Sequence, residues 1–141
     1  MYVHYELNNS NPLLDLLVQT TVDYVMDDLD LHDVPGSIMI STVDHIEVPE
    51  YLDYVYGEAG VIDGIHDISI LSTLTVKEVI NVVAHELRHV WQRVHGWDMY
   101  STLPYMQRPY EIDAFQYNTQ FYSRMGMAVY NAYLAKKLVA A

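Results

Sequence analysis

The stretch TVKEVINVVAHELRHVWQRVHG, from Thr75 to Gly96, has the pattern of one amphipathic helix with both of its ends marked. Thr75 and Glu78 have the spacing of a capping box, which predicts that the helix begins near Val76. Gly96 is well suited to end it. At about 100° per residue the apolar residues form one continuous face, which we expect to be the core side: Val76, Val79, Ile80, Val83, Ala84, Leu87, Val90, Trp91 and Val94.

The two histidines of this stretch lie outside the apolar face. His85, Glu86 and His89 fall together on a second face beside Val82. They form the HExxH pattern, in which a spacing of four stacks two imidazoles one turn apart so that both can reach one zinc ion. Glu86 would then lie beside the ion, where it can take a proton from zinc-bound water. The remaining polar residues are expected to face solvent: Lys77, Asn81, Arg88 and Gln92.

This motif has a competing interpretation, in which a solvent-exposed helix carries two histidines by chance. The capped helix and the separation of the histidines from the core face favour the metal site, because a motif gains weight when its expected structural context is present. The motif therefore predicts one Zn²⁺ ion bound by His85 and His89, with Glu86 as the catalytic residue.

The sequence before this helix predicts an α+β fold. Apolar residues at helical spacing indicate an N-terminal helix capped by Asn11, with Pro12 at its first position. The β-branched segment Ser37–Val43 is typical of a buried strand. Asp63 and Gly64 separate two short apolar runs, which is the turn chemistry of a tight β-hairpin. The second arm of that hairpin, Ile65–Leu71, leads almost directly into the helix of the histidines and completes a short mixed sheet.

Two other segments are assigned from their composition. The segment from Asp44 to Tyr56 is mixed and is expected to be irregular. A loop broken by Pro104 and Pro109 is followed by a long helix, predicted from about Tyr110 towards Lys137. Its inward stripe is expected to consist of Ala114, Tyr117, Phe121, Met125, Ala128 and Ala132.

The composition limits the class of protein. A chain of 141 residues, 51% of them hydrophobic, predicts a single domain spanning residues 1–141. A formal net charge of -12 disfavours nucleic acid as a partner. Since there is no cysteine, histidine and carboxylate are the strong metal ligands that the chain offers. No signal peptide and no membrane-spanning run is recognisable, so we expect a cytoplasmic protein without a membrane partner.

A catalytic zinc ion usually has three protein ligands and an open position, and His95 is one candidate for the third ligand. It gives HELRHVWQRVH, the histidine spacing of the metzincins. However, Gln92 stands where that motif has the glycine at which the chain turns. A helix that continues through Gln92 would carry His95 away from the side of His85 and His89.

Glu111 is the favoured candidate for the third ligand. It lies 22 residues beyond His89, in the first turn of the predicted long helix and at the edge of its inward stripe. Its alternative role is that of an ordinary first-turn carboxylate, stabilised by the helix dipole. Asp113 is the poorer ligand, because it points to the opposite, polar face.

The segments AHELRHVWQ and PYEIDAF together resemble the gluzincin metallopeptidases, which combine HExxH on one helix with a glutamate on a following helix, in the setting Glu-x-x-Ala. The small size and the order of elements are similar to the minigluzincins and to compact zinc-peptidase domains of phage and bacterial genomes. The resemblance implies a zincin-like fold with one Zn²⁺ bound by His85, His89 and Glu111. It implies endopeptidase activity with Glu86 as general base and acid. It also implies a protein or peptide substrate that lies extended along Ile65–Leu71 as the edge of the sheet.

The sequence departs from the gluzincins at Phe115. Many members carry an acidic or amide residue at this position, one turn after the glutamate ligand, where it orients a zinc-binding histidine. Asn118 or a backbone carbonyl could take this role instead. The departure leaves a second interpretation open, a zinc-binding interaction module without proteolysis. A third interpretation, an acidic interaction protein, rests on the net charge alone.

Overall fold

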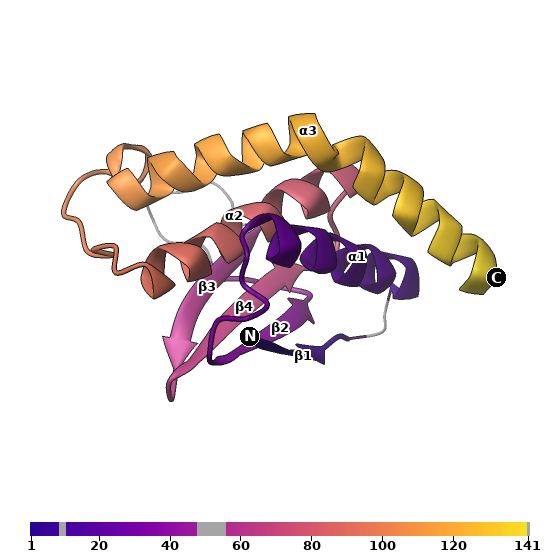
Figure 1. Cartoon of the computed structure of the whole chain (residues 1–141), viewed down its shortest axis with the longest axis horizontal. Helices are drawn as coiled ribbons and strands as arrows, with labels where there is room; N and C mark the ends of the chain where they lie inside the picture. Colours follow the sequence, from indigo (N-terminus) through magenta and orange to yellow (C-terminus); the bar gives the residue numbers. More distant parts are fainter. Residues whose placement is uncertain (9–10, 48–55, 141) are drawn as a thin grey trace.

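A computed structural model describes residues 1–8, 11–47 and 56–140. The described residues form an α+β fold with three α-helices, one 3-10 turn and a four-stranded mixed sheet (Figure 1). In chain order the elements are β1 (Tyr2–Glu6), α1 (Pro12–Asp28), β2 (Ser37–Val43), β3 (Gly57–Ile62), β4 (Ile65–Leu71), α2 (Val76–Val94), η1 (Tyr105–Gln107) and α3 (Pro109–Ala140).

The predicted start and end of α2 are confirmed, although Val76, which was assigned to the core side, is 37% exposed. The Thr75 side chain accepts a hydrogen bond from the backbone N–H of Glu78, and the Glu78 side chain accepts one from the backbone of Thr75, so the capping box is present. The helix ends at Val94, and Gly96 has the positive φ of 78° that favours glycine after a helix. The hairpin turn is equally clear, since Asp63 and Gly64 have φ angles of 51° and 79°, as a tight two-residue turn requires.

The sheet order corrects the expected sheet edge. The strands follow the order β1-β2-β4-β3, with β1, β2 and β4 parallel and β3 antiparallel to β4. β4 therefore has a hydrogen-bonded neighbour on both sides, and the prediction that Ile65–Leu71 forms the edge is wrong. The edge beside α2 is β3. Pairing of β2 with β4, in which Ile38 lies opposite His66, joins segments far apart in the chain and leaves no local sequence signal.

Two segments differ from their sequence interpretation in another way. β1 was not predicted; it pairs with β2 at the other edge of the sheet. Its alternation is weak because Val3 is only partly buried and its other residues are exposed. Residues 48–55, most of the segment expected to be irregular, lie outside the described part of the chain. Tyr56, which follows them, is described.

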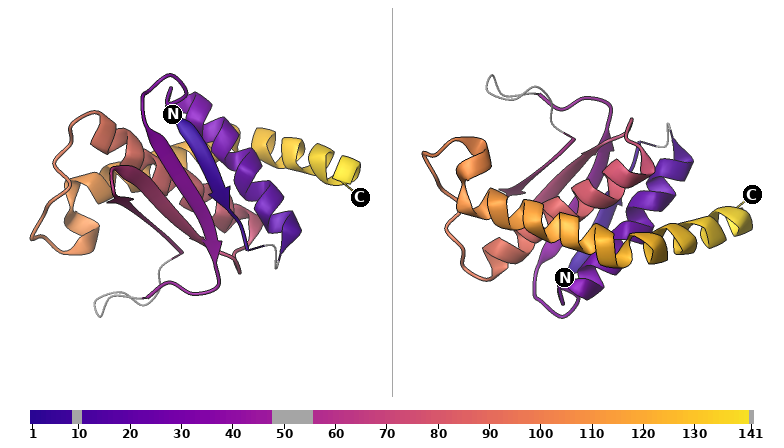
Figure 2. Two further views of the ribbon diagram at one scale, coloured as in Figure 1. Left: turned by 90° about the horizontal axis from the view of Figure 1, so that it is seen from below. Right: turned by 90° about the horizontal axis from the view of Figure 1, so that it is seen from above.

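The helices lie in two tiers on one side of the sheet. α1 and α2 pack next to one another over the sheet, and α3 runs across both of them (Figures 1 and 2). The core between these layers includes Val18, Ile38, Ile70, Ile80 and Phe121, each at most 1% exposed. Within the described residues, none of the helices is both long enough and apolar enough to cross a membrane.

The predicted inward stripe of α3 is confirmed up to Met125, which is partly buried against the core, and is wrong at Ala128. Ala114, Tyr117 and Phe121 are buried as predicted. Further along, Val129 and Tyr133 are buried, whereas Ala128 is exposed. α3 crosses first α2 and then α1 (Figure 2), and its buried face shifts by one position along the helix.

Candidate metal centre

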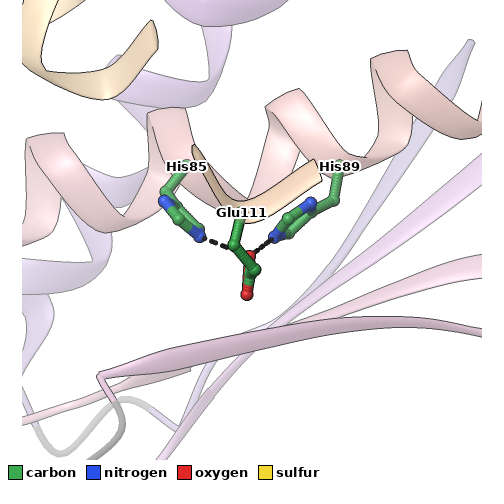
Figure 3. A group of neighbouring side chains, drawn as sticks. All are labelled: His85, His89 and Glu111. Atoms are coloured by element: carbon green, nitrogen blue, oxygen red, sulfur yellow. Dashed lines mark hydrogen bonds and ion pairs between the residues drawn. The ribbon is translucent and has the colours of Figure 1, made fainter. Parts of the chain in front are cut away.

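Three buried side chains from two helices meet between α2, α3 and the sheet. His85 and His89 lie one turn apart on α2, and Glu111 comes from the first turn of α3 (Figure 3). The Glu111 Oε1 atom lies 3.2 Å from His85 Nε2 and 2.6 Å from His89 Nε2. The three possible ligand atoms all lie within 4.8 Å of one another, so this group could hold a metal ion.

The centre is enclosed by the surrounding protein. His85, His89 and Glu111 are only 5%, 6% and 4% exposed, so the histidine face of α2 is covered rather than open to solvent. Burial raises the pKa of the Glu111 carboxyl, but the hydrogen bonds with His85 and His89 outweigh this effect and hold its pKa well below the ordinary value. Burial lowers the pKa of His85, and the neighbouring Glu111 and Glu86 carboxylates more than reverse that shift, so its pKa is raised. The Glu111 carboxylate and the His85 imidazole therefore favour each other's charged forms.

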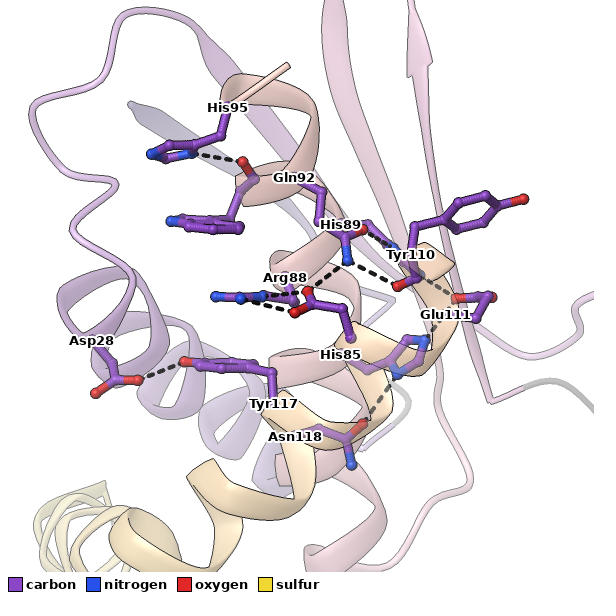
Figure 4. Close-up of polar contacts among 12 residues, drawn as sticks. Asp28, His85, Arg88, His89, Gln92, His95, Tyr110, Glu111, Tyr117 and Asn118 are labelled. Atoms are coloured by element: carbon purple, nitrogen blue, oxygen red, sulfur yellow. Dashed lines mark hydrogen bonds and ion pairs between the residues drawn. The ribbon is translucent and has the colours of Figure 1, made fainter. Parts of the chain in front are cut away.

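Gln92 holds His89 from the next turn of α2. Its Oε1 lies 2.8 Å from His89 Nδ1, and its Nε2 donates to the Tyr110 carbonyl and to Asp113 Oδ2, both at 2.8 Å (Figure 4). The prediction that Gln92 faces solvent is wrong, because its exposure is 0%. Angle around the helix alone did not reveal that the start of α3 crosses this position.

Asn118 takes the place that the sequence left open beside His85. Its Oδ1 lies 3.0 Å from His85 Nδ1, while its Nδ2 donates to Asn81 Oδ1 at 2.8 Å. Rotation of the amide by 180° would instead let its nitrogen donate to His85 Nδ1 and to the Ala114 carbonyl. Phe115, at the position of the missing acidic residue, packs its ring 4.5 Å from the His85 ring. The histidine therefore has a hydrogen-bonding partner despite the departure at Phe115.

His95 does not join the centre. α2 continues through Gln92, and His95 caps its end, exposed to solvent. Its Nδ1 donates to the Trp91 carbonyl at 2.8 Å, and its ring stacks on Trp91 with a centroid distance of 4.3 Å (Figure 4). The metzincin alternative, which needs His95 as the third ligand, is wrong for this structure.

Glu86 lies next to the centre without belonging to the ligand group. It is 5% exposed, and burial raises the pKa of its carboxyl. The charges of His85, His89 and Arg93 act in the opposite direction, yet its pKa remains above the ordinary value. β3 approaches α2 closely here, because a Cβ on Gly57 would stand 3.3 Å from Glu86 Cγ.

The chain matches no protein-family model, no curated protein and no solved structure. The chemistry of the centre must therefore be inferred from its own residues.

The sequence did not predict the positions of two residues beside the centre, Gln92 and Arg93. Gln92 was assigned to solvent, and Arg93 was not singled out, although its charge influences both Glu86 and Glu111. Arg93 lies seven residues after Glu86, which is two helical turns and hence the same face of α2. The seven-residue spacing therefore could have predicted that Arg93 lies near Glu86.

Proposed function

We propose that this chain is a zinc-dependent peptidase of the gluzincin type, in which His85, His89 and Glu111 hold the metal and Glu86 is the general base. The observation that carries the proposal is the meeting of these three buried side chains, drawn from two helices, directly beside a second buried carboxylate, that of Glu86. A lone HExxH helix would lack that third ligand.

The donor set suits zinc. Two imidazoles and one carboxylate form the ligand set of several catalytic zinc sites, which keep a further position open. A hard cation such as Mg²⁺ or Ca²⁺ would prefer oxygen ligands throughout. When bound, zinc acts as a Lewis acid and lowers the pKa of coordinated water to about 7.

Glu86 has the properties of a base for hydrolysis. Its raised pKa makes the carboxylate a stronger base than an exposed glutamate. In the proposed reaction Glu86 accepts a proton from the attacking water as the water oxygen bonds to the carbonyl carbon. It returns this proton to the amine nitrogen as the C–N bond breaks. Its position on the same helix as both histidines fixes it relative to the ligands.

The proposed substrate is a protein or peptide in extended conformation along β3. Among the described residues β3 pairs only with β4, so its other side offers backbone groups for an added strand. Gly57 at the start of β3 lies against Val82 and Glu86, which places this edge beside the centre. Strand addition reads the backbone of the substrate, so we expect unfolded segments to be preferred over folded domains.

Three variants test this function. We expect elemental analysis to find about one zinc ion per chain in the parent and none in Glu111→Ala. His95→Ala should retain its zinc and is the matched control, because it removes a nearby histidine that lies outside the centre. Glu86→Gln should keep zinc but lose hydrolysis of an unfolded protein such as reduced casein. A parent without zinc, or Glu86→Gln with full activity, would contradict the proposal. Zinc retained with no turnover by the parent would instead favour the non-proteolytic binding module.

A further inference from the structure

Gln92 is a buried polar side chain whose three hydrogen bonds are all accounted for. Burying an amide is costly unless it is hydrogen-bonded, so a glutamine at 0% exposure must have partners that fix it. Its partners are His89 Nδ1, the Tyr110 carbonyl and Asp113 Oδ2, each at 2.8 Å.

These partners allow one orientation of the amide. The Tyr110 carbonyl and the Asp113 carboxylate are acceptors, so the NH₂ group of Gln92 must face them. The carbonyl oxygen of the amide then faces His89 Nδ1. Because that oxygen can only accept, Nδ1 must carry a proton, and Nε2 is the nitrogen that turns to Glu111. This is the arrangement that metal binding through Nε2 requires.

Asp113 is itself held in place. Arg88 binds it through Nε at 2.7 Å and Nη2 at 3.1 Å, in a bidentate pair, and the Arg88 guanidinium stacks 3.7 Å above the Trp91 ring. A chain of contacts thus runs from Arg88 through Asp113 and Gln92 to His89. Figure 4 shows Arg88, Gln92 and His89 along this chain.

His85 lacks this constraint. The unrotated Asn118 amide directs its oxygen at the Ala114 carbonyl oxygen as well as at His85 Nδ1, whereas the rotated amide donates to both and is favoured. The rotated amide favours the neutral His85 tautomer with its proton on Nε2, the nitrogen that faces Glu111. The two histidines therefore differ in the tautomer that their hydrogen-bonding partners favour before a metal arrives.

We propose that Gln92, held by Asp113, is a positioning residue that fixes His89 with Nδ1 protonated and Nε2 directed at the metal position, whereas His85 acquires its ligand tautomer only on binding. The proposal rests on the metal centre of the proposed function and is independent of peptide hydrolysis. In metal proteins, loss of such an orienting partner weakens metal affinity by about 10- to 100-fold.

The test compares two glutamine-to-methionine changes of equal size. Gln92→Met keeps the volume and removes every hydrogen bond, and Gln120→Met makes the same change at an exposed position of α3. Zinc affinity, measured by competition with a chromogenic chelator, should fall about 10- to 100-fold in Gln92→Met and stay unchanged in Gln120→Met. Equal affinities in the folded Gln92→Met variant and the parent would overturn the proposal.

The second readout needs neither zinc nor activity. Long-range ¹H–¹⁵N spectra of the metal-free parent, recorded at a pH at which both imidazoles are neutral, should show His89 with Nδ1 protonated and His85 with Nε2 protonated. A metal-free His89 with unprotonated Nδ1 would overturn the proposal, and this measurement decides the matter if Gln92→Met does not fold. If the parent bound no zinc but showed the expected His89 tautomer, the proposed function would be wrong and the hydrogen-bond constraint on His89 would stand. The failure of one proposal can therefore be distinguished from the failure of the other.

Discussion

Replacement of Gly57 by alanine tests the close approach of β3 to the helix of the histidines. A Cβ at this position would stand 2.6 Å from Val82 Cγ2, 3.1 Å from the Ser69 carbonyl oxygen and 3.3 Å from Glu86 Cγ. Carbon atoms pack best at about 3.5–4.0 Å, so the new methyl group overlaps Val82 by about 1 Å. Either β3 or α2 must move to accommodate it.

The expected loss of stability follows from two opposing effects. Overpacking of this kind costs about 1–3 kcal/mol. Alanine also restricts the unfolded chain, which favours folding by about 0.4–1 kcal/mol. We therefore expect Gly57→Ala to lower the free energy of unfolding by about 1–2 kcal/mol. Because the methyl group also presses on Glu86, kcat/KM of the proposed peptidase reaction should fall by about 10- to 100-fold under conditions where the variant is fully folded.

Urea denaturation of a matched set provides the assay. Gly60→Ala lies in the same strand with nothing within 4 Å of its Cβ, so it should leave stability unchanged or slightly raised. Val82→Ala removes the atom of closest overlap, and the double variant Gly57→Ala/Val82→Ala should be more stable than the sum of the two single changes predicts. If Gly57→Ala were as stable as Gly60→Ala, or if the two changes were additive, the close contact inferred for β3 and α2 would be refuted.

Three further changes test other contacts by urea denaturation. Thr75→Ala removes the N-cap of α2 and should cost about 1 kcal/mol, whereas Thr75→Ser keeps the acceptor and should cost little; equal losses would contradict the cap. Arg88→Lys gives up the bidentate bond to Asp113 and the stack on Trp91 and should cost about 1–2 kcal/mol, so a lysine variant as stable as the parent would contradict this role. Tyr117→Phe removes the 2.7 Å hydrogen bond to Asp28 and should cost about 1.5 kcal/mol at pH 7. Burial raises the pKa of the Asp28 carboxyl, but hydrogen bonds from Arg124 and Tyr117 outweigh this effect and leave its pKa in the folded protein below 3.8. The stabilisation from this hydrogen bond is therefore complete above pH 3.8 and is lost as the pH falls through the pKa of Asp28 in the folded protein. A cost of Tyr117→Phe that did not diminish below pH 3.8 would show that the charge of Asp28 is not involved.

The features that sequence predicted well are those set by neighbouring residues. The capping box at Thr75, the turn at Asp63 and Gly64, and the strand Ser37–Val43 each depend on chemistry within a few positions, and each is confirmed. Glu111 was favoured as a ligand from its place at the edge of the α3 stripe, and the structure brings it to His85 and His89.

The features that sequence missed depend on which distant segments meet. β4 was expected at the edge of the sheet, but it pairs with β2 on one side and with β3 on the other, so β3 is the edge strand. The same limit applies to the second half of α3, where Val129 is buried in place of Ala128. A helical wheel gives the angle of each residue but not the identity of what covers it.

A local rule of helix geometry could have predicted the contact of Gln92 with His89. Side chains in an α-helix lean towards its N-terminus, so a residue at i+3 reaches back over residue i. A glutamine three positions after a ligand histidine is therefore placed to meet that histidine, and its length brings the amide to the ring. The same rule puts Arg88 three positions after His85, but a guanidinium offers only donors and turns to Asp113 instead. His85 then depends on Asn118 from another helix, a partner that no local pattern fixes. The residue three positions after each histidine therefore orients it only where that residue can accept a hydrogen bond, as Gln92 does and Arg88 does not.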